Sequence, residues 1–413
     1  MADYRHRRRE IYRPLKQEGV FTWDWMYDRE YALASLYPVS RREQAELQHA
    51  AEELGKIFGK TLALVQRGDG VLLQELGIPL PAVAAVRAPF LPNVATVIGR
   101  FDFTRTAEGW KMLEFNSDTP GGVVEAFYVN ERVCSYYGEE NPNRGMEEQL
   151  TAAFRRAVAY YRAGGYNTKH LFFSALDWHE EDAGTARYLL RCSGFEARFS
   201  ALRDLRVYDD ALYALETDGL QPVDVLYRLH PLGLMAGEQD TDGYPTGAHV
   251  LDLAVRKKVA LINPPAALIA QSKGLQALVW NLHETGEFFT EAEHKVIACH
   301  MLPTYFENRF LHREFFVTKP VFGREGGAVT IYDRDGGVVA RDQESFYWDQ
   351  ELIYQRYIDL EQVHVETMEG IYQGRLIWGV FLLNGKASAI SARLGGQITD
   401  DLAYFLPLKY TAY

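Results

Sequence analysis

Residues 317–331 read VTKPVFGREGGAVTI, in which a lysine closes an apolar run and a glycine-rich loop follows. Because glycine has no Cβ, Gly323, Gly326 and Gly327 can bring backbone N–H groups close to an anion. The residues after the loop, AVTIYD, are typical of a strand. The stretch therefore predicts a two-stranded flap over a phosphate, with Lys319 as a compact charge at the strand end that reaches it.

Other phosphate-binding loops fit this stretch less well. A Walker A loop needs GxxxxGK[ST] between a strand and a helix, and no Lys-Ser or Lys-Thr pair follows these glycines. A protein kinase has the order strand, glycine loop, strand, but the GxGxxG, HRD and DFG motifs are absent from the sequence. A solvated hairpin with a glycine-rich turn fits the loop, taken alone, as well as phosphate binding does.

A second stretch, GRFDFTRTAEGWKMLEFNSDTPGG at residues 99–122, predicts two strands joined around TAEG. Glu114 and Asn116 are two residues apart and therefore lie on one face. An odd number of connecting residues, or a bulge, would place Asp102 opposite Glu114 and Arg100 opposite Asn116. Two carboxylates and an amide oxygen form a hard, oxygen-only set suited to Mg2+. The alternative is a charged solvent face, which the apolar residues of the opposite face disfavour.

The rest of the chain changes pattern twice. Apolar residues recur at helical spacing in residues 41–64 and 146–163, which we expect to be amphipathic helices. Between residues 168 and 264, strand-like runs alternate with a helix that ends at Gly194, a pattern typical of a parallel α/β domain. Beyond residue 300, strand-like runs separated by turn signals such as DRDGG and LNGK predict a largely antiparallel sheet.

Composition limits the possible partners. The chain has 413 residues, of which 47% are hydrophobic and 24% charged, as in a globular protein of about two or three domains. A net charge of -12 argues against nucleic acid as a general partner. No stretch is long and apolar enough to span a bilayer, and three cysteines far apart in sequence fit a reducing cytoplasm. The arginine-rich start, MADYRHRRRE, is expected to be a solvated arm.

Six separated segments connect the sequence to a family: RFDF, LEFNSDTPGG, QSKGLQALVW, VTKPVFGREGG, IYQ and ISARLGGQIT. Their order resembles that of the glutathionylspermidine synthetase family, whose members resemble a circularly permuted ATP-grasp ligase, from Arg100 to Pro407. The resemblance implies a mixed α+β and α/β fold. Residues 1–145 would form a helical region with the metal-binding hairpin, residues 146–265 a Rossmann-like pre-ATP-grasp domain, and residues 266–413 the ATP-grasp nucleotide-binding region with the flap.

The resemblance also implies a role for each polar residue. The residues that would hold Mg2+ at the phosphates of ATP are Asp102, Glu114 and Asn116. The residues that would bind ATP itself are Lys273, Lys319, Gly323, Gly326, Gly327, Gln355, Tyr357 and Ile358. The arginines that would surround the reacting carboxyl group are Arg100, Arg324 and Arg393. The residues that would bind the substrates are Thr119, Gly121, Glu181 and Asp182.

Two positions depart from the family pattern at its thiol-peptide end. Gly121 stands where the glutathionylspermidine enzyme has a serine, and Leu229 replaces a hydroxyl residue. Both departures leave the identity of the peptide substrate open. Glu181 and Asp182 belong to HEEDAGT, where carboxylates would attract a polycationic amine. An acidic helix start explains these two residues equally well.

The chemistry that the resemblance implies is ATP-dependent ligation of a carboxylate and an amine, with ATP and Mg2+ as cofactors. The γ-phosphoryl group of ATP would move to a small-molecule or peptide carboxylate, and a polyamine or another amine would attack the acyl phosphate. One alternative is a nucleotide-binding ATP-grasp protein without ligase turnover that acts in a partner complex. Another is phosphoryl transfer to a stable acceptor. We expect neither nucleic acid nor membrane as a partner, and the oligomeric state is left open, a homo-oligomer included.

Overall fold

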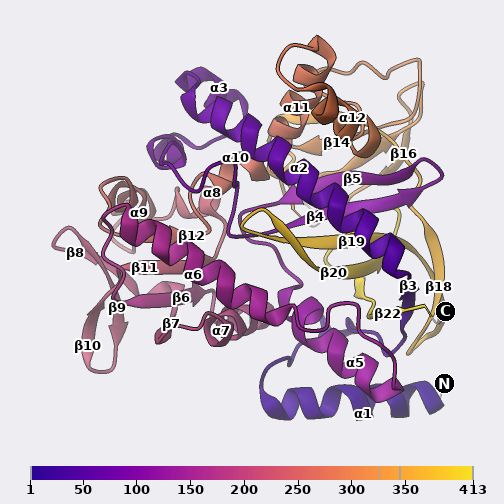
Figure 1. The fold of residues 1–413 in the computed structure, drawn as a ribbon, viewed down its shortest axis with the longest axis horizontal. Coiled ribbons are helices and arrows are strands. Elements are labelled where there is room, and N and C mark those ends of the chain that lie inside the picture. The colour runs from indigo at the N-terminus through magenta and orange to yellow at the C-terminus, as the bar shows by residue number, and fades with distance from the viewer. Residues whose placement is uncertain (1, 325, 344–345, 412–413) are drawn as a thin grey trace.

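The computed structural model describes residues 2–324, 326–343 and 346–411. In these residues the chain forms a mixed α/β fold with several sheets and flanking helices (Figure 1). Three sheets position the site: a central sheet of six strands, a second of five strands and a third of four. Of the helices described, none combines the length and the apolar character needed to cross a bilayer.

The central sheet is antiparallel and joins segments from both ends of the chain. Strand β4 pairs with β5 on one side and with β19 on the other, so the hairpin of residues 99–122 lies beside strands near the C-terminus. Its strands are β4 (Ile98–Thr106), β5 (Gly109–Asn116), β18 (Gln362–Thr367), β19 (Gly370–Leu383), β20 (Lys386–Gly395) and β21 (Tyr404–Phe405).

The register of the β4–β5 hairpin is the one that the sequence predicts. Asp102 pairs with Glu114 and Arg100 pairs with Asn116. The register shifts between Asp102 and Phe103, which is the bulge that this pairing requires. All four polar residues therefore share one face of the sheet.

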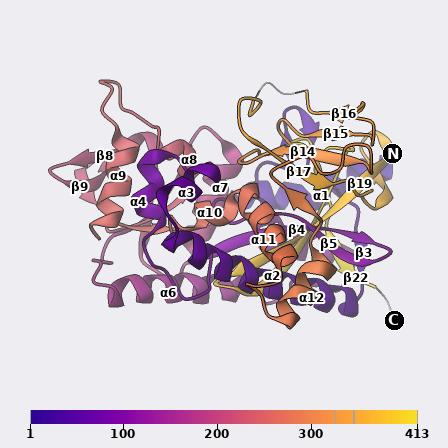
Figure 2. The same ribbon diagram turned by 90° about the horizontal axis from the view of Figure 1, so that it is seen from above.

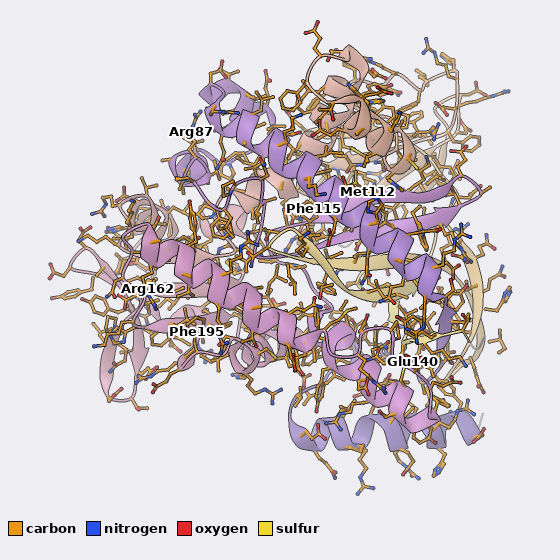
Figure 3. The ribbon with its side chains drawn as sticks, in the orientation of Figure 1. Arg87, Met112, Phe115, Glu140, Arg162 and Phe195 are labelled. Carbon is orange, nitrogen blue, oxygen red and sulfur yellow. The ribbon has the colours of Figure 1, made fainter. Side chains whose placement is uncertain are left out.

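The other face of this hairpin packs against helix α2 (Arg41–Arg67), which also contacts β19 and β20. Phe101 and Phe115 stack with ring centroids 3.8 Å apart, and Phe58 of α2 meets each of them edge-on at 5.5 Å. Figure 3 labels Phe115 beside α2. Ser40 caps the helix in a capping box with Glu43. The predicted amphipathic helix of residues 41–64 is confirmed, and it holds the polar face of the hairpin toward the opposite side.

The strands beyond residue 300 do not form the single sheet expected from their pattern. Alternation shows that a segment is a strand but not which strand it pairs with. Strands β18 to β20 add to β4, whereas the earlier ones form a separate antiparallel sheet. Figure 2 shows this sheet on the side of the central sheet opposite α2. In spatial order it consists of β13 (Thr304–Tyr305), β17 (Leu352–Arg356), β14 (Phe316–Pro320), β15 (Thr330–Tyr332) and β16 (Val338–Arg341).

The parallel α/β unit predicted between residues 168 and 264 is confirmed. Every pairing in its sheet is parallel. In spatial order the strands are β12 (Ala260–Ile262), β11 (Val225–Leu229), β6 (Leu171–Ala175) and β7 (Ala197–Ala201). Helix α6 (Glu147–Ala163) covers it with Phe154, which packs against Phe173 and Tyr227, and α7 (Glu180–Cys192) connects β6 to β7.

Smaller elements complete the described chain. The short strands are β1 (Trp25–Met26), β2 (Arg29–Glu30), β3 (Tyr37–Val39), β8 (Leu205–Tyr208), β9 (Ala211–Glu216), β10 (Gly219–Pro222) and β22 (Leu408–Tyr410). The remaining helices are α3 (Gly70–Glu75), α4 (Val83–Val86), α5 (Asn130–Tyr137), α8 (Leu232–Met235), α9 (Thr246–Val255), α10 (Ala267–Gln271), α11 (Lys273–Thr285) and α12 (Glu291–His300). Three single turns are η1 (Leu80–Ala82), η2 (Glu125–Val129) and η3 (Leu202–Asp204).

The arginine-rich start is not the solvated arm that the sequence suggested. It forms helix α1 (Ala2–Glu18), which buries an apolar face. Arg8 is buried with it and forms ion pairs with Asp24 at 2.8 Å and Glu30 at 3.0 Å. Tyr4 donates a hydrogen bond to Glu30 at 2.7 Å. Composition alone concealed the helix because its charged residues outnumber the apolar ones that pack.

Candidate functional site

A single cavity brings together every site residue predicted from the sequence. Its walls come from the polar face of the β4–β5 hairpin, the five-stranded sheet with its glycine-rich loop, the start of α7 and the N-terminal segment. The proposed metal ligands, the two lysines, the three arginines, the flap glycines, the nucleotide hinge and the substrate residues all line it. Side chains from distant parts of the chain therefore meet in one place, as a single binding site requires.

The three predicted metal ligands converge. The Asn116 Nδ2 group donates to an oxygen of Asp102 and to an oxygen of Glu114, at 3.3 Å in both cases. Arg100 binds Asp102 through Nε at 2.6 Å and through Nη2 at 3.0 Å, and Arg393 binds it at 2.7 Å. The Asp102 side chain is only 1% exposed, so its charge depends on these guanidinium groups.

Cations also surround Glu114. Burial alone would raise the pKa of its carboxyl group, but Lys273, Lys319 and Arg393 outweigh burial and lower the pKa below its ordinary range. The Lys273 Nζ atom lies 3.3 Å from the Glu114 Oε2 atom. The carboxylate is therefore ionised at neutral pH and available to a divalent cation.

The donor set is chemically suited to Mg2+, which prefers oxygen ligands and keeps part of its hydration shell. Asp102 and Glu114 supply carboxylates on one face. The Asn116 Nδ2 group faces both carboxylates and its Oδ1 atom accepts from Gln271 Nε2 at 3.5 Å, so the amide would have to turn over to offer its oxygen to a cation. Among the residues that the structure describes, no group of three or more His, Cys, Asp or Glu side chains could hold a metal. The candidate site thus depends on the amide as its third ligand.

Two lysines form the cationic part of the cavity. Lys273 begins helix α11, where its Nζ donates to the Gly323 carbonyl at 2.6 Å. Lys319 is the last residue but one of strand β14, and its Nζ donates to the Leu113 carbonyl at 3.2 Å. Burial lowers the pKa of Lys319 to about 8; Glu114 opposes this shift and Lys273 adds to it. A bound phosphate would favour the charged form of this lysine further.

The flap glycines are positions where backbone passes close to other atoms. A Cβ at Gly323 would lie 2.9 Å from the Gly327 carbonyl oxygen, and one at Gly326 would lie 2.6 Å from the Thr399 oxygen. The N–H groups of Gly323 and Gly327 donate within the loop, to Pro320 at 3.3 Å and to the Arg324 carbonyl at 2.7 Å. An anion would have to replace these bonds. Glu325 of the loop lies outside the described residues.

The predicted nucleotide hinge begins with Gln355 inside strand β17 and continues past the end of the strand. Gln355 is buried, and its Nε2 donates to the Thr304 hydroxyl at 3.2 Å. The backbone N–H of Tyr357 donates to Phe315 at 3.1 Å, so the hinge is tied to the start of β14. Tyr357 and Ile358 line the cavity beside Gln355.

Two arginines hold the loop that follows strand β5. Arg100 Nη1 donates to the Gly121 carbonyl at 2.6 Å. Arg324, from the flap, donates to the hydroxyl group of Thr119. The flap is thus in direct contact with residues 117–122, which we call the substrate loop. This contact is expected if Arg324 acts at a group held by that loop.

The acidic substrate residues lie in the first turn of α7. His179 caps this helix by accepting a hydrogen bond from the Asp182 N–H at 3.3 Å. Glu181 and Asp182 line the cavity from this position. Both explanations of HEEDAGT are thus compatible with the structure, because the acidic helix start itself faces the cavity.

Sequence reasoning missed several residues that complete the site. Gln271 accepts hydrogen bonds from the N–H groups of Ser117 and Asp118, at 2.8 and 3.1 Å, and so fixes the loop after β5. Glu125 lines the cavity and is buried with Tyr31 beside it. A signal for Glu125 was present, since it is the one charged residue in the apolar run VVEAFYV at residues 123–129.

The geometry defines a protein with one cavity that combines a lysine pair, a candidate oxygen site for a divalent cation and carboxylates near an arginine-held loop. Residues 4–410 match the family model described as glutathionylspermidine synthase preATP-grasp. The chain belongs to this family.

The chain is also similar to two curated proteins and to one solved structure. A Haemophilus influenzae protein provisionally named acid–amine ligase is 24% identical over 323 residues, which cover 75% of this chain and 73% of that protein. Trypanothione synthetase of Crithidia fasciculata is 22% identical over 281 residues, 64% of this chain but only 40% of that protein. The apoform structure of a glutathione synthetase-like effector from Globodera pallida has a TM-score of 0.55 at 11% identity, over 91% of this chain and 89% of that one. At this identity the structural match shows the fold alone.

Proposed function

We propose that the protein is an ATP-dependent carboxylate–amine ligase that forms an amide bond through an acyl phosphate and releases ADP. The observation that carries the proposal is the meeting of Lys273, Lys319 and the Asp102, Glu114, Asn116 set in one cavity with three arginines. Family membership and the printed names of the Haemophilus and Crithidia relatives support the same class of reaction.

Each group in the cavity has a task in such a reaction. Lys273 and Lys319 would bind the phosphates of ATP as compact charges. Asp102, Glu114 and Asn116 would hold Mg2+, which would neutralise charge on the transferring phosphoryl group. The five-stranded sheet would enclose the nucleotide, with Gln355 and the residues after it at the adenine. We assign this part of the chain to an ATP-grasp nucleotide site and the parallel sheet to the pre-ATP-grasp domain.

The arginines are placed to handle the carboxylate substrate. Arg100 already uses three N–H groups, two on Asp102 and one on Gly121, which leaves two for a ligand. Burial alone would lower the pKa of Arg100, but Asp102 raises it above its ordinary value, so the guanidinium stays charged. Arg324 reaches the substrate loop from the flap. A guanidinium at this point would stabilise the negative charge that develops when the phosphoryl group moves and when the amine attacks.

The substrates follow from the chemistry of the cavity walls. The carboxylate would be presented near Thr119 and Gly121, where Arg100 and Arg324 meet. The amine would approach from the side of Glu181 and Asp182, whose charges attract cations. We infer a small-molecule or peptide acid and a polyamine or another amine.

The test is an ADP-release assay with Mg2+, ATP and a panel of acids and amines, tried singly and in pairs. The ligase predicts ADP only when both an acid and an amine are present, with amide product detected by mass spectrometry. ATP binding without ADP for any pair would instead support a nucleotide-binding protein without turnover. ADP formed with an acceptor alone, and unaffected by amines, would support phosphoryl transfer to a stable acceptor.

A further inference from the structure

Helix α1 lies along one edge of the molecule (Figure 1), and a second cavity of about 200 Å³ is formed against it. Its walls come from α1, from Asp24 and Trp25 in the segment after the helix, and from Met368. None of its described lining residues lines the central cavity. The proposed reaction makes no use of this cavity, although α1 carries the arginine-rich stretch MADYRHRRRE.

The buried part of the wall is rigid and electrically balanced. The Arg8 side chain, which is 7% exposed, forms ion pairs with Asp24 at 2.8 Å and with Glu30 at 3.0 Å. Its guanidinium carbon lies 4.8 Å from the centre of the Trp25 ring. Lys16 forms a further ion pair with Asp24 at 2.5 Å. Two cations thus meet two carboxylates, and this part of the wall gives the cavity no net charge.

Three other arginines of α1 decide the charge of the cavity. Arg5, Arg9 and Arg13 line it at intervals of four residues, so they share one exposed face of the helix. Among the described residues, neither Arg5 nor Arg13 forms an ion pair, and Arg9 has only the distant pair with Glu10 at 3.8 Å. The cavity is therefore positive in a chain whose net charge is -12.

This arrangement lowers the stability of the helix. Like charges four residues apart on a helix repel each other, and Arg5, Arg9 and Arg13 form two such pairs. Arg7 of the same helix, in contrast, is compensated by an ion pair with Glu366 at 2.6 Å. A repulsion that the protein itself leaves uncompensated is expected where a ligand supplies the opposite charge.

The chemistry of the cavity favours a ligand with several phosphate groups. A guanidinium fork matches two phosphate oxygens, and three forks along one helix face suit a chain of phosphates better than a single anion. Trp25 is 39% exposed and adds an aromatic surface on which a nucleotide base can stack. The exposed residues of α1 are polar or charged apart from Pro14, so the helix lacks the apolar face with which an amphipathic helix enters a membrane.

We propose that the cavity beside α1 binds a polyphosphate group through Arg5, Arg9 and Arg13. The group belongs either to inorganic polyphosphate or to the phosphate tail of a nucleotide, whose base then stacks on Trp25. This site is separate from the ATP site of the proposed function and does not depend on it.

Calorimetric titration of the full chain with inorganic tripolyphosphate, at fixed ionic strength, tests the proposal. The variant is Arg5→Gln/Arg13→Gln, which relieves repulsion on the helix and leaves the buried ion pairs in place. The control is Arg155→Gln/Arg156→Gln, which removes two exposed arginines of α6 outside both cavities. Because the control changes the net charge equally, it accounts for the general attraction of anions. Lys319→Ala, titrated in parallel, identifies binding at the central cavity.

The wild-type protein should bind tripolyphosphate at a site whose affinity Lys319→Ala leaves unchanged. Arg5→Gln/Arg13→Gln should weaken binding at this site at least about tenfold, as expected for lost charged hydrogen bonds, and the control should match the wild type. Binding only at a site that Lys319→Ala weakens, or an equal loss in the α1 variant and the control, overturns the inference.

A comparison of ADP with pyrophosphate at the same site then identifies the source of the phosphate group. Tighter binding of ADP that is abolished by Trp25→Ala indicates a nucleotide. Equal binding of the two probes indicates inorganic polyphosphate. Either result supports the site, because both probes carry the phosphate chain that the arginines hold.

Discussion

Asp102 and Glu114 face each other across strands β4 and β5, yet the Asp102 side chain is 1% exposed and the Glu114 side chain is 28% exposed. The buried partner forms ion pairs with Arg100 and Arg393, and the more exposed one lies against Lys273. The two carboxylates proposed as ligands of one metal ion thus contribute unequally to the stability of the fold. Substitution can separate that contribution from metal binding.

We expect Asp102→Asn to lower the free energy of unfolding by about 3 kcal/mol, because it leaves the buried Arg100 without its counter-ion. Glu114→Gln should cost less, about 1 to 2 kcal/mol, because its side chain is 28% exposed even though the buried Lys273 loses a counter-ion. Both variants should lose the strengthening of ATP binding by Mg2+. Urea unfolding and ATP titration with and without Mg2+ measure the two effects. Equal stability losses, or an unchanged effect of Mg2+ on either variant, would contradict the assignment.

Arg324→Ala should affect turnover far more than nucleotide binding. The guanidinium contacts Thr119 on the substrate loop, and loss of a donor aimed at developing charge typically lowers the rate by about a hundredfold to a thousandfold. ATP affinity should change only a few-fold. Arg334→Ala, at an exposed turn beside Asp335, is the matched control and should leave ADP release unaltered. A large loss of ATP affinity in Arg324→Ala would place the side chain at the nucleotide instead.

ATP binding should weaken as the pH rises above about 8, which is the lowered pKa of Lys319 in the free protein. Above this pH the lysine is increasingly neutral, whereas a bound phosphate favours its charged form, so binding takes up a proton. Affinity should be constant well below pH 8 and fall by up to about tenfold per pH unit above it. In Lys319→Arg the charge persists, and this part of the pH dependence should disappear. Titrations at several pH values compare the two proteins, and parallel curves would refute the role of Lys319.

The sequence was sufficient where local pattern decides structure. The period of the β4–β5 hairpin, with a bulge, placed Asp102 opposite Glu114. Strand and helix alternation gave the parallel sheet. The lysine that closes an apolar run indicated Lys319, the family resemblance added Lys273, and both line the cavity. In each case, the side chains that matter are fixed by residues close by in the chain.

The sequence did not predict which segments pair when they lie far apart in the chain. Nothing in the local pattern of β19 indicates that it pairs with β4, more than two hundred and fifty residues earlier in the chain, and the strands beyond residue 300 were therefore placed in one sheet. The apolar face of α1 was hidden among arginines. Glu125 was missed because its partners, Trp23 and Tyr31, lie about a hundred residues away in sequence. Such contacts follow from tertiary packing, which one sequence does not specify.

Gly326→Ala tests whether the flap must lie close to the C-terminal segment. Gly326 has φ +74, and a Cβ there would lie 2.6 Å from the Thr399 carbonyl oxygen. Alanine should lower stability by about 1 to 3 kcal/mol through backbone strain and should also weaken ATP binding, because the loop is pushed off Thr399. Gly336→Ala is the control: its φ is +88, but the nearest atom to its Cβ is a flexible Leu311 methyl at 3.2 Å. It should show a similar strain cost with unchanged ATP affinity. Thermal unfolding measures the loss of stability, and ATP titration measures the change in affinity. Equal ATP affinities for the two variants would show that the close approach of Gly326 to Thr399 is not needed for binding.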